Sequence, residues 1–416
     1  MIEPSDRLAR ALAALQGHYP RSIELSLDRI SDLLEALGRP QDRLPPVIHV
    51  AGTNGKGSTC AFLRAMAEAA GLRVHVYSSP HLVRFNERVR LAGELISDAA
   101  FADALERTGA ALGEGQITHF EATTAAALLA FSETPADLLV LEVGLGGRYD
   151  ATNVIDTSDV AVISPVDFDH KQFLGDDLAG IAGEKAGIIR SGSPVVSARQ
   201  SPVVAEVIAA RARDLGARLH VLGEDDLERV ETPLALQGSH QLANAALAAK
   251  ALEVWGDRRI TPLAIREGSR RAAWPARMQK LADGAVTAMG RGAEVWLDGG
   301  HNPHAARAVA ALLAGRPGAC VLVAAMMASK DAEGFFAAFA GLAPRVFTIP
   351  NAEGHEGRPP DELAEAARRV GLEARPCRTL GEAMEAAAGL SPARILICGS
   401  LYLAGDVLAM NGELPD

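Results

Sequence analysis

Short apolar runs alternate with longer amphipathic segments along almost the whole chain. The short runs have the length of buried strands, and the longer segments carry apolar residues at the spacing of one helix face. This alternation is typical of β-α units around a mainly parallel sheet. We expect strands at residues 47–50, 74–77, 138–143, 160–163, 195–196 and 219–222, and helices at residues 58–70, 180–189, 203–215 and 241–255.

The alternation pauses between residues 270 and 293, where Pro275 and two glycines interrupt it. A chain of 416 residues also exceeds the roughly 250–300 residues at which single cores stop growing. We therefore predict an α/β fold of two domains, residues 1–275 with a P-loop-type, mainly parallel sheet and residues 276–416 with a smaller Rossmann-like sheet. In the second domain we expect strands at residues 295–297, 321–325, 345–349 and 395–398, and helices at 303–314, 332–340 and 361–370.

The charge and the composition exclude several classes of protein. The net charge is −11, from 41 basic and 52 acidic residues, and neither domain is basic, which argues against a nucleic-acid surface. No apolar run is long enough to cross a membrane, and the N-terminus lacks the apolar core of a signal peptide. The four cysteines form no CxxC pair, so neither a zinc site nor a disulfide framework is indicated. We expect a soluble cytoplasmic protein.

The sharpest local signal is a glycine-rich turn, Gly52 to Ser58, between a buried strand and a helix. Backbone N–H groups in such a turn can cradle a polyphosphate, while a lysine reaches the outer phosphates and a hydroxyl reaches magnesium. Its spacing departs from the common GxxxxGK[ST] string, because Gly57 stands between Lys56 and Ser58. We predict a nucleotide site formed by Thr53, Asn54, Gly55, Lys56, Gly57 and Ser58.

Polar residues follow three further strands at the carboxyl end, where ligands bind in parallel sheets. Glu142 ends one strand and is followed by glycines, His170 follows another, and Ser79 follows a third. Carboxylate, imidazole and hydroxyl groups at one edge can hold Mg²⁺ or Mn²⁺. In the second domain, Asp298 and His301 follow a strand in the same way, and we expect that edge to close over the nucleotide.

Lysine is the rare cation of this chain, with six lysines against thirty-five arginines. Lys185 nevertheless lies in a helix flanked by small and apolar residues. A partly buried primary amine can lose its proton and take up CO₂ as a carbamate, which a guanidinium cannot do. We therefore regard Lys185 as a candidate catalytic residue, with Lys56, His170 and Glu142.

The chain resembles folylpolyglutamate synthase and dihydrofolate synthase, of the Mur ligase superfamily. The resemblance runs from about residue 18 to residue 406, with the motifs in the same order. The stretches that carry it are Gly52–Ser58, Ser78–Glu87 (SSPHLVRFNE), Glu142–Asn153 (EVGLGGRYDATN), Asp169–His170, Leu174–Gly175, Glu184–Ile188, Gly238–Ala246 (GSHQLANAA), Pro275–Arg277 and Asp298–His304.

This resemblance implies a Mur ligase-type ATP-binding domain, a C-terminal glutamate ligase domain and an ATP-dependent amide ligase. ATP would phosphorylate a carboxylate of 7,8-dihydropteroate, or of tetrahydrofolate and its polyglutamates, and L-glutamate would attack the acyl phosphate. Both activities are expected. By resemblance, Asn244, Arg277 and Asp298 also bind ATP, Ser79, Glu142, His170 and Ser58 hold two Mg²⁺ ions, with Mn²⁺ as a substitute, and Lys185 is carbamylated.

The resemblance also implies which residues bind the substrates. Matching stretches contact the pterin in members with both activities. These candidates are Glu24, Leu25, Ser26, Leu27, Thr118, His119, Phe120, Glu121, Tyr149, Asp150 and Ala151, with His301 in the second domain. Arg84, Arg88 and Arg148 could meet glutamate carboxylates as bidentate partners.

Three alternatives were weighed against this interpretation. A cell-wall Mur ligase would need a further N-terminal domain, for which Gly52 begins too early. A P-loop kinase or NTPase conflicts with the GKG spacing and with the second carboxylate and glycine motif. A nucleotide sensor without catalysis conflicts with the combination of Glu142, His170 and Lys185. We expect a monomer whose partners are small molecules, with no nucleic acid and no membrane.

Overall fold

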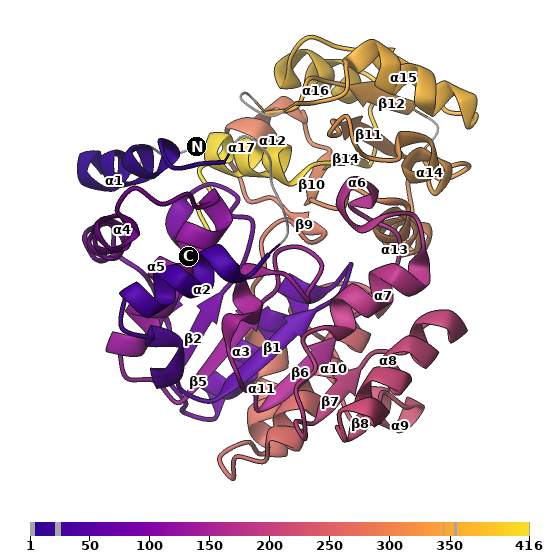
Figure 1. Cartoon of the computed structure of the whole chain (residues 1–416). Coiled ribbons are helices and arrows are strands. Elements are labelled where there is room, and N and C mark those ends of the chain that lie inside the picture. The colour runs from indigo at the N-terminus through magenta and orange to yellow at the C-terminus, as the bar shows by residue number, and fades with distance from the viewer. Residues whose placement is uncertain (1–4, 21–25, 344, 353–355, 416) are drawn as a thin grey trace. The chain divides into compact units, whose positions relative to one another are not determined.

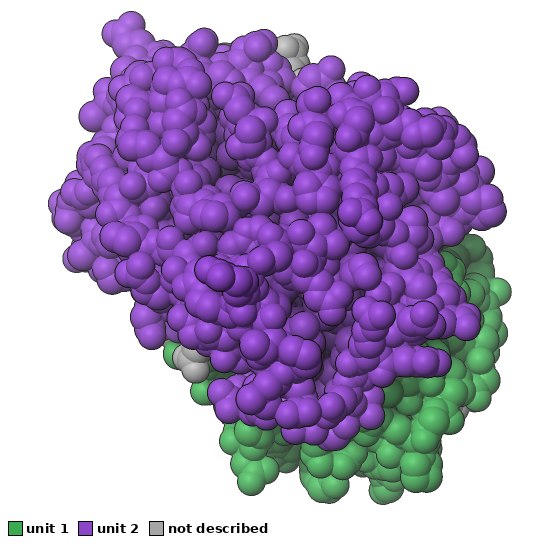
Figure 2. All heavy atoms as spheres, turned by 90° about the horizontal axis from the view of Figure 1, so that it is seen from below, with its two compact units in different colours: residues 1–2, 236–240, 274–416 green, residues 3–235, 241–273 purple. Residues whose placement is uncertain are grey.

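The computed structural model describes residues 5–20, 26–343, 345–352 and 356–415. The chain divides into two compact units (Figure 2). The large unit comprises Glu3–Ala235 and Gln241–Ala273, and the small unit comprises Leu236–His240 and Trp274–Asp416 with the first two residues. Within the described residues, none of the helices combines the length and the apolar character needed to cross a bilayer.

The large unit is built on an eight-stranded sheet in the order β4-β3-β2-β5-β1-β6-β7-β8. The strands β2, β5, β1, β6, β7 and β8 are parallel to one another. β3 and β4 extend the edge beside β2 as an antiparallel hairpin. Figure 1 shows β1 in the middle of this sheet, between β5 and β6. The strands are β1 Val47–Ala51, β2 Val74–Tyr77, β3 Val89–Leu91, β4 Glu94–Leu95, β5 Leu138–Glu142, β6 Val160–Ile163, β7 Val195–Ser197 and β8 Leu219–Val221.

Helices cover both faces of this sheet, which explains why its central strands carry apolar residues on both faces and do not alternate with polar ones. On one face, residues of α1, α2, α4 and α5 share a core with β1, β2 and β5. On the same face, residues of α7 and α8 share a second core with β6 and β7. α3 also contacts β1, β2 and β5. The helices are α1 Asp6–Gln16, α2 Asp28–Ala36, η1 Pro40–Arg43, α3 Lys56–Ala69, η2 Phe85–Arg88, α4 Asp98–Leu112, α5 His119–Glu133, η3 Ala151–Val154, α6 Lys171–Leu174, α7 Leu178–Ala186, α8 Pro202–Asp214, α9 Glu224–Glu228, α10 Ser239–Trp255 and α11 Pro262–Arg271.

The helix after the glycine-rich turn, α3, packs tightly against α11 at Gly268. A Cβ on Gly268 would overlap the backbone of Met66 and Ala65, so the two helices approach as closely as they do only because this residue has no side chain. The contact anchors the helix that begins at the nucleotide loop.

We expect Gly268→Ala to lower the free energy of unfolding of the protein by about 1–3 kcal/mol, because overpacking forces the two helices apart. Gly183→Ala in α7 is the matched control, since nothing lies within 4 Å of a Cβ there and alanine is the better helix former. Urea unfolding followed by circular dichroism measures both. Equal stability of the two variants would contradict the tight contact.

The small unit has a six-stranded sheet in the order β13-β12-β11-β14-β10-β9. All its strand pairs are parallel except β10 with β9, which are antiparallel. One core joins α13, α14 and α15 to this sheet. The elements are β9 Gln279–Lys280, α12 Ala285–Met289, β10 Glu294–Asp298, α13 Pro303–Ala314, β11 Cys320–Ala324, α14 Ala332–Ala337, β12 Arg345–Thr348, α15 Pro360–Arg369, β13 Glu373–Pro376, α16 Leu380–Ala388, β14 Arg394–Cys398 and α17 Leu401–Asn411.

The predicted α/β fold with mainly parallel sheets is confirmed, and each expected strand and helix is present within a few residues. Several elements were not expected from the pattern. They are the helices α1, α2, α4, α5 and α6, the short helices η1, η2 and η3, the hairpin of β3 and β4, the edge strands β9 and β13, and the helices α9, α11, α12, α16 and α17. The helix expected at 332–340 is shorter and ends at Ala337.

Candidate functional site

The glycine-rich turn connects the carboxyl end of β1 to the first turn of α3. Gly55, with φ of 84°, is the N-cap of α3. Because glycine has no side chain, no side-chain oxygen caps the helix. The first three N–H groups of a helix have no partner within it, so those of Lys56, Gly57 and Ser58 form a site for an anion at the positive end of the helix dipole. The backbone N–H groups of Thr53 and Asn54, in contrast, both donate to the carbonyl oxygen of Pro165, at 2.9 and 3.2 Å.

The shape of the turn depends on Gly52. Its φ of 148° is one that side chains rarely allow, and a Cβ there would overlap the hydroxyl of Ser164. That hydroxyl donates to the carbonyl oxygen of Asn54 at 2.8 Å. The turn is therefore held against the residues that follow β6 and leaves its own inner surface to a ligand.

Lys56 and Lys185 meet at one atom. The Nζ of Lys56 donates to the carbonyl oxygen of Gly52 at 3.2 Å and to that of Thr53 at 3.4 Å. The Nζ of Lys185, on α7, donates to the same Gly52 oxygen at 2.9 Å, across 133 positions of sequence. Two of the six lysines of the chain thus lie together beside the candidate phosphate cradle.

The environment of Lys185 weakens its hold on a proton. Its side chain is buried with 5% exposed. Burial, and then the positive charge of Lys56, lower the pKa of Lys185 from its ordinary value to about 7. About half of these amines are uncharged at neutral pH, against roughly one in three thousand for an ordinary lysine. The uncharged amine is the form that can react with CO₂.

The structure brings the candidate metal ligands only partly together. Glu142, buried at the end of β5, accepts a hydrogen bond from the backbone N–H of Ser79 at 3.3 Å. Ser58 is buried in the first turn of α3. His170 is exposed and begins α6 in a left-handed conformation. Among the described residues no three His, Cys, Asp or Glu side chains form a cluster that could hold a metal ion by themselves.

Asn244, which the resemblance implies as an ATP contact, approaches the turn from α10. Its amide lies so close to Gly55 that a Cβ on the glycine would be 2.5 Å from the Asn244 Oδ1. The amide is held by a hydrogen bond from Nδ2 to the Oε1 of Gln241 at 3.0 Å. A buried amide beside the turn can direct a hydrogen bond at a nucleotide.

In the small unit, Arg277, Asp298 and His301 gather at the carboxyl end of β10. Asp298 accepts from the backbone N–H groups of Met278, at 2.8 Å, and Gly300, at 2.7 Å. This ties the segment before β9 to the loop after β10 and places the Arg277 guanidinium next to Gly299. His301 bonds through Nδ1 to the carbonyl oxygen of Gly299 at 3.0 Å.

The candidate acceptor residues lie in three segments of the large unit. Glu24 and Leu25 are outside the described residues, while Ser26 hydrogen-bonds Asp28 in the first turn of α2. The hydroxyl of Thr118 caps α5, and the carboxylate of Glu121 accepts a hydrogen bond from the backbone N–H of Thr118. Burial lowers the pKa of His119 to about 4, and its Nδ1 bonds to the hydroxyl of Tyr19 at 2.9 Å.

The third segment, after the glycines of β5, is divided between exposed and buried residues. Tyr149 is 45% exposed, whereas Asp150 and Ala151 are buried. Phe120 packs where a Cβ on Gly144 would stand. The ring of Tyr149 is free to meet a ligand, whereas the carboxylate of Asp150 faces the inside of its own loop, where it accepts hydrogen bonds from Leu145 and Thr152.

Three arginines were suggested as partners for a carboxylate. Arg148 is exposed and lies 3.9 Å from the carboxylate of Glu184. Arg88 is buried, donates to the Nδ1 of His81 at 3.0 Å and lies over the ring of Phe85. Arg84 is partly exposed, and its backbone N–H donates to Glu87.

Sequence reasoning did not find Arg29. This residue of α2 donates twice to the buried carboxylate of Glu121, from Nε to Oε2 at 3.1 Å and from Nη2 to Oε1 at 2.9 Å. The pair joins α2 to the start of α5, where Thr118 to Glu121 lie. No sequence signal could have found it, because the partners are 92 positions apart.

We expect Arg29→Met to lower the free energy of unfolding by about 2–3 kcal/mol, because it leaves a buried carboxylate without its cation. Adding Glu121→Gln should recover most of this loss, since the charge that needed a partner is gone. Thermal unfolding of the two single variants and the double variant gives the coupling. Additive losses would show that the two side chains do not depend on each other.

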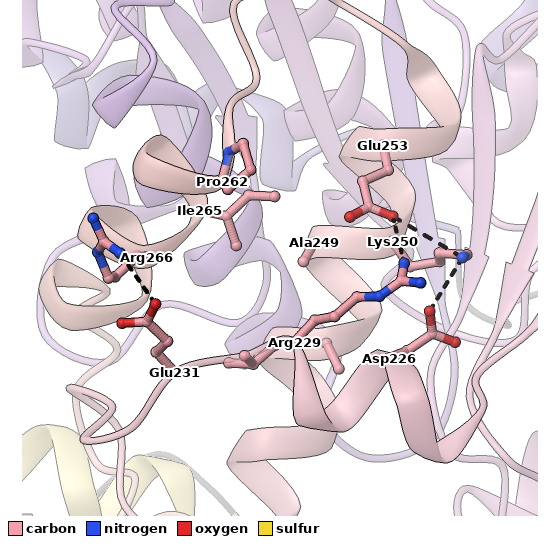
Figure 3. A pocket seen from close by; sticks show the side chains of 11 residues that line it. Asp226, Arg229, Glu231, Ala249, Lys250, Glu253, Pro262, Ile265 and Arg266 are labelled. Carbon is pink, nitrogen blue, oxygen red and sulfur yellow. Dashed lines mark hydrogen bonds and ion pairs between the residues drawn. The ribbon is translucent and has the colours of Figure 1, made fainter.

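A pocket of about 180 Å³ lies elsewhere in the large unit, between α9, α10 and α11 (Figure 3). None of the residues predicted for the site line it. Its charges face each other in ion pairs, with Lys250 on Asp226, Arg266 on Glu231 and Arg229 on Glu253. A pocket whose cations are already neutralised is a poor site for a polyphosphate, so the nucleotide site stays with the turn after β1.

Comparison with known proteins shows which protein family the chain is similar to. Residues 50–225 match the Mur ligase middle domain, and residues 276–401 match the glutamate ligase domain of Mur ligases. A dihydrofolate synthase/folylpolyglutamate synthase of Escherichia coli is 34% identical over 96% of this chain and 94% of its own length. A folylpolyglutamate synthase of Mycobacterium tuberculosis solved with ADP has a TM-score of 0.89 and 32% identity, covering 99% of each chain. A bifunctional enzyme of Yersinia pestis, solved with AMPPNP and a manganese ion, has a TM-score of 0.83 at 33% identity, over 98% of this chain and 99% of its own.

Proposed function

The chain belongs to the Mur ligase family, among the dihydrofolate synthases/folylpolyglutamate synthases, and we propose how its residues carry out the reaction of that group. The enzyme joins L-glutamate to a carboxylate of a pteroate or folate, with ATP as the energy source. The carboxylate takes the terminal phosphoryl group of ATP, the amine of glutamate displaces phosphate from the acyl phosphate, and ADP and phosphate are released.

The turn after β1 fits the phosphates of ATP. The N–H groups of Lys56, Gly57 and Ser58 lie at the start of α3, where the helix dipole favours an anion. Lys56 contributes a compact positive charge. Its Nζ donates to two carbonyl oxygens, and a change of rotamer would let it donate to a phosphate. Thr53 and Asn54 line the turn, with Asn244 beside Gly55. By the family resemblance, Arg277 and Asp298 are also proposed ATP contacts.

The donor set also fits magnesium. Mg²⁺ takes one or two carboxylates together with phosphate oxygens and water, not a dedicated protein cage, which agrees with the lack of a larger acidic cluster among the described residues. We propose that Ser79, Glu142, His170 and Ser58 hold two ions, with Mn²⁺ able to replace them. The ions supply positive charge to the phosphate oxygens while the phosphoryl group is transferred.

Lys185 is the proposed carbamylated lysine. Its amine has a pKa near 7, is buried and lies beside the phosphate turn. A carbamate would convert one cation of this crowded pair into an anion next to Lys56, where it could accept a hydrogen bond or face a metal ion. The conversion would relieve the repulsion between the two lysines, which itself contributes to the lowered pKa.

The acceptor binds, in this proposal, beside Thr118 to Glu121 and Tyr149 to Ala151, and we also propose Glu24, Leu25, Ser26 and Leu27 as acceptor contacts. Phe120 and Tyr149 supply rings for a pterin. Arg84 is proposed to receive a glutamate carboxylate, and His301 is a further proposed substrate contact. Asp150 shapes its loop from within, because its carboxylate is occupied by backbone and hydroxyl groups of the same loop.

We propose one role for each of the two domains. Residues 1–275 form the ATP-binding, Mur ligase-type domain, and residues 276–416 form the glutamate ligase domain, in line with the family match at 276–401. We propose that the enzyme is cytoplasmic, in line with its four free and buried cysteines, and that it is a monomer. Its partners are small molecules, namely ATP, L-glutamate, 7,8-dihydropteroate, tetrahydrofolate and the polyglutamates of the latter.

The observation that carries these assignments is the meeting of Lys56 and Lys185 on the Gly52 oxygen. The choice of acceptor is tested by giving the purified enzyme ATP, Mg²⁺ and L-glutamate with either 7,8-dihydropteroate or tetrahydrofolate. Glutamyl products from both acceptors are expected. A product from only one of them would reduce the proposal to a single activity.

A further inference from the structure

A histidine that the reaction does not use lies in the middle of the central strand. His49 is fully buried in β1, where it pairs with Leu141 of β5 and Ala161 of β6. It precedes Gly52 by three residues. Its imidazole contacts η3, where Nε2 lies 2.9 Å from the hydroxyl of Thr152. The partner is 103 positions away in the sequence.

The hydroxyl of Thr152 continues the contact to Asp150. It donates to Oδ1 of that buried carboxylate at 2.6 Å. The same Oδ1 accepts from the backbone N–H of Thr152 at 3.0 Å, and Oδ2 accepts from the backbone N–H of Leu145 at 2.8 Å. A line of hydrogen bonds therefore runs from the centre of the sheet, through Thr152 and Asp150, to the start of the glycine loop.

The geometry fixes the state of the imidazole. A threonine hydroxyl has one proton, and that of Thr152 is directed at Asp150. His49 must then donate from Nε2–H, which leaves Nδ1 as the unprotonated nitrogen. Nδ1 is buried and has no hydrogen-bond partner among the described residues. Burial, and then the charge of Arg190, lower the pKa of His49 to about 3, so the ring stays neutral.

The loop that ends at Asp150 is tied at a second point. The backbone N–H of Arg148 donates to the carbonyl oxygen of Glu184 on α7 at 2.8 Å, and the amide of Asn153 donates to the carbonyl oxygen of Arg148 at 2.9 Å. Tyr149 stands between these ties and is exposed. Its position therefore depends on how firmly Asp150 and Arg148 are held.

We propose that His49 is a positioning residue, whose Nε2–H donor acts through Thr152 on Asp150 and so fixes the loop 144–150 that presents Tyr149. This inference rests on the proposed function only for the meaning of Tyr149 as an acceptor contact. An apolar residue would fill the same place in the strand without burying an unpaired nitrogen, so the imidazole gives the fold a directed donor that a leucine would not.

Hydrogen exchange in the full-length enzyme tests the positioning directly, because the Leu145 N–H is bonded to Asp150. The variants are His49→Leu, which removes the donor, Thr152→Val, which removes the hydroxyl at the same shape, and His49→Gln, whose amide nitrogen can donate from nearly the place of Nε2. We expect His49→Leu and Thr152→Val to speed exchange in the segment 144–150 by about tenfold or more, and His49→Gln to stay near the wild type.

The double variant His49→Leu with Thr152→Val should exchange no faster than the faster single variant, since both act on one line of hydrogen bonds. Strands β6 and β7 serve as the reference. Unchanged exchange in segment 144–150 of Thr152→Val would overturn the proposal, and so would equal acceleration in β6 and β7, which would indicate a general loss of stability. Thr152→Val keeps the test available even if His49→Leu does not fold.

Kinetics separates this inference from the acceptor site itself. We expect Thr152→Val to raise the KM for the acceptor about threefold to tenfold while the KM for ATP stays unchanged, and Tyr149→Ala to raise the acceptor KM as well. An unchanged KM in Tyr149→Ala with faster loop exchange in Thr152→Val would refute the acceptor contact and keep the positioning. A raised KM in Tyr149→Ala with unchanged exchange in Thr152→Val would keep the acceptor contact and refute the positioning.

Discussion

Lys56→Ala is expected to lower kcat for glutamate-dependent ADP release about a thousandfold. The Nζ of Lys56 lies at the start of α3, on the carbonyl oxygens of Gly52 and Thr53, where it can follow the charge that develops on the transferred phosphoryl group. Removing one directed donor from such a site costs about 10²–10³ in rate. The fold should survive, because the side chain is only partly buried and ends on loop carbonyls.

The matched control for this variant is Lys280→Ala. Lys280 lies on the edge strand β9, is 53% exposed and pairs with Glu294, so its loss should leave kcat within about twofold, as for most surface positions. Steady-state ADP release and thermal unfolding are measured for both variants. A Lys56→Ala enzyme with kcat within about threefold of the wild type would remove this lysine from the phosphate site.

Lys185→Arg is expected to lower kcat at least about a hundredfold, although the formal charge of the unmodified side chain is kept. A guanidinium has no uncharged form in proteins and cannot become a carbamate. The lysine is uncharged in about half of the molecules near pH 7, because its pKa is lowered to about 7. Its neutral fraction falls as the pH drops through 7, so carbamate formation should weaken on the acid side.

Two measurements check the role of Lys185. Activity is followed with and without added bicarbonate in CO₂-depleted buffer from pH 6 to pH 8, where bicarbonate should restore the wild type and have no effect on Lys185→Arg. Lys250→Arg is the control, since Lys250 pairs with Asp226 in the pocket of Figure 3 and needs only its charge. Wild-type activity in Lys185→Arg would show that no carbamate is needed.

The parts of the site that could be predicted from the sequence follow from the periodicity of strands. Glu142 ends a parallel strand, and Gly52 and Ser79 follow two others, which puts all three residues at one edge of a sheet. The structure joins Ser79 to Glu142 there. The rarity of lysine was also informative, because two lysines meet at the phosphate turn. Such signals are local, and each needs only a few neighbouring residues to be recognised.

The parts that could not be predicted depend on contacts between distant positions. Arg29 and Glu121 are joined across 92 positions, and His49 and Thr152 across 103, so neither pair has a pattern in the sequence. α5 was missed for another reason. Its residues are nearly all apolar or small and are buried on every side, and a helix without a polar face lacks the 3.6-residue periodicity by which helices are recognised.

Two contacts changed the interpretation of residues that the sequence had already singled out. Thr53 and Asn54 were expected to direct their backbone N–H groups at the phosphates, but both donate to Pro165, which leaves that task to Lys56, Gly57 and Ser58. Asp150 was expected beside the pterin, and its carboxylate is used inside its own loop. In both cases hydrogen bonding of the backbone, which no side-chain pattern reveals, decides where the group points.

The most direct test of the account is ADP release by the purified enzyme with ATP, Mg²⁺ and tetrahydrofolate, in the presence and absence of L-glutamate, with the folate product weighed by mass spectrometry. A ligase of this kind should release ADP only when glutamate and the folate are both present, and each ADP should correspond to one glutamyl residue added. ADP release that continues without glutamate, or that leaves the folate unchanged in mass, would contradict the ligase mechanism and indicate a kinase or an NTPase.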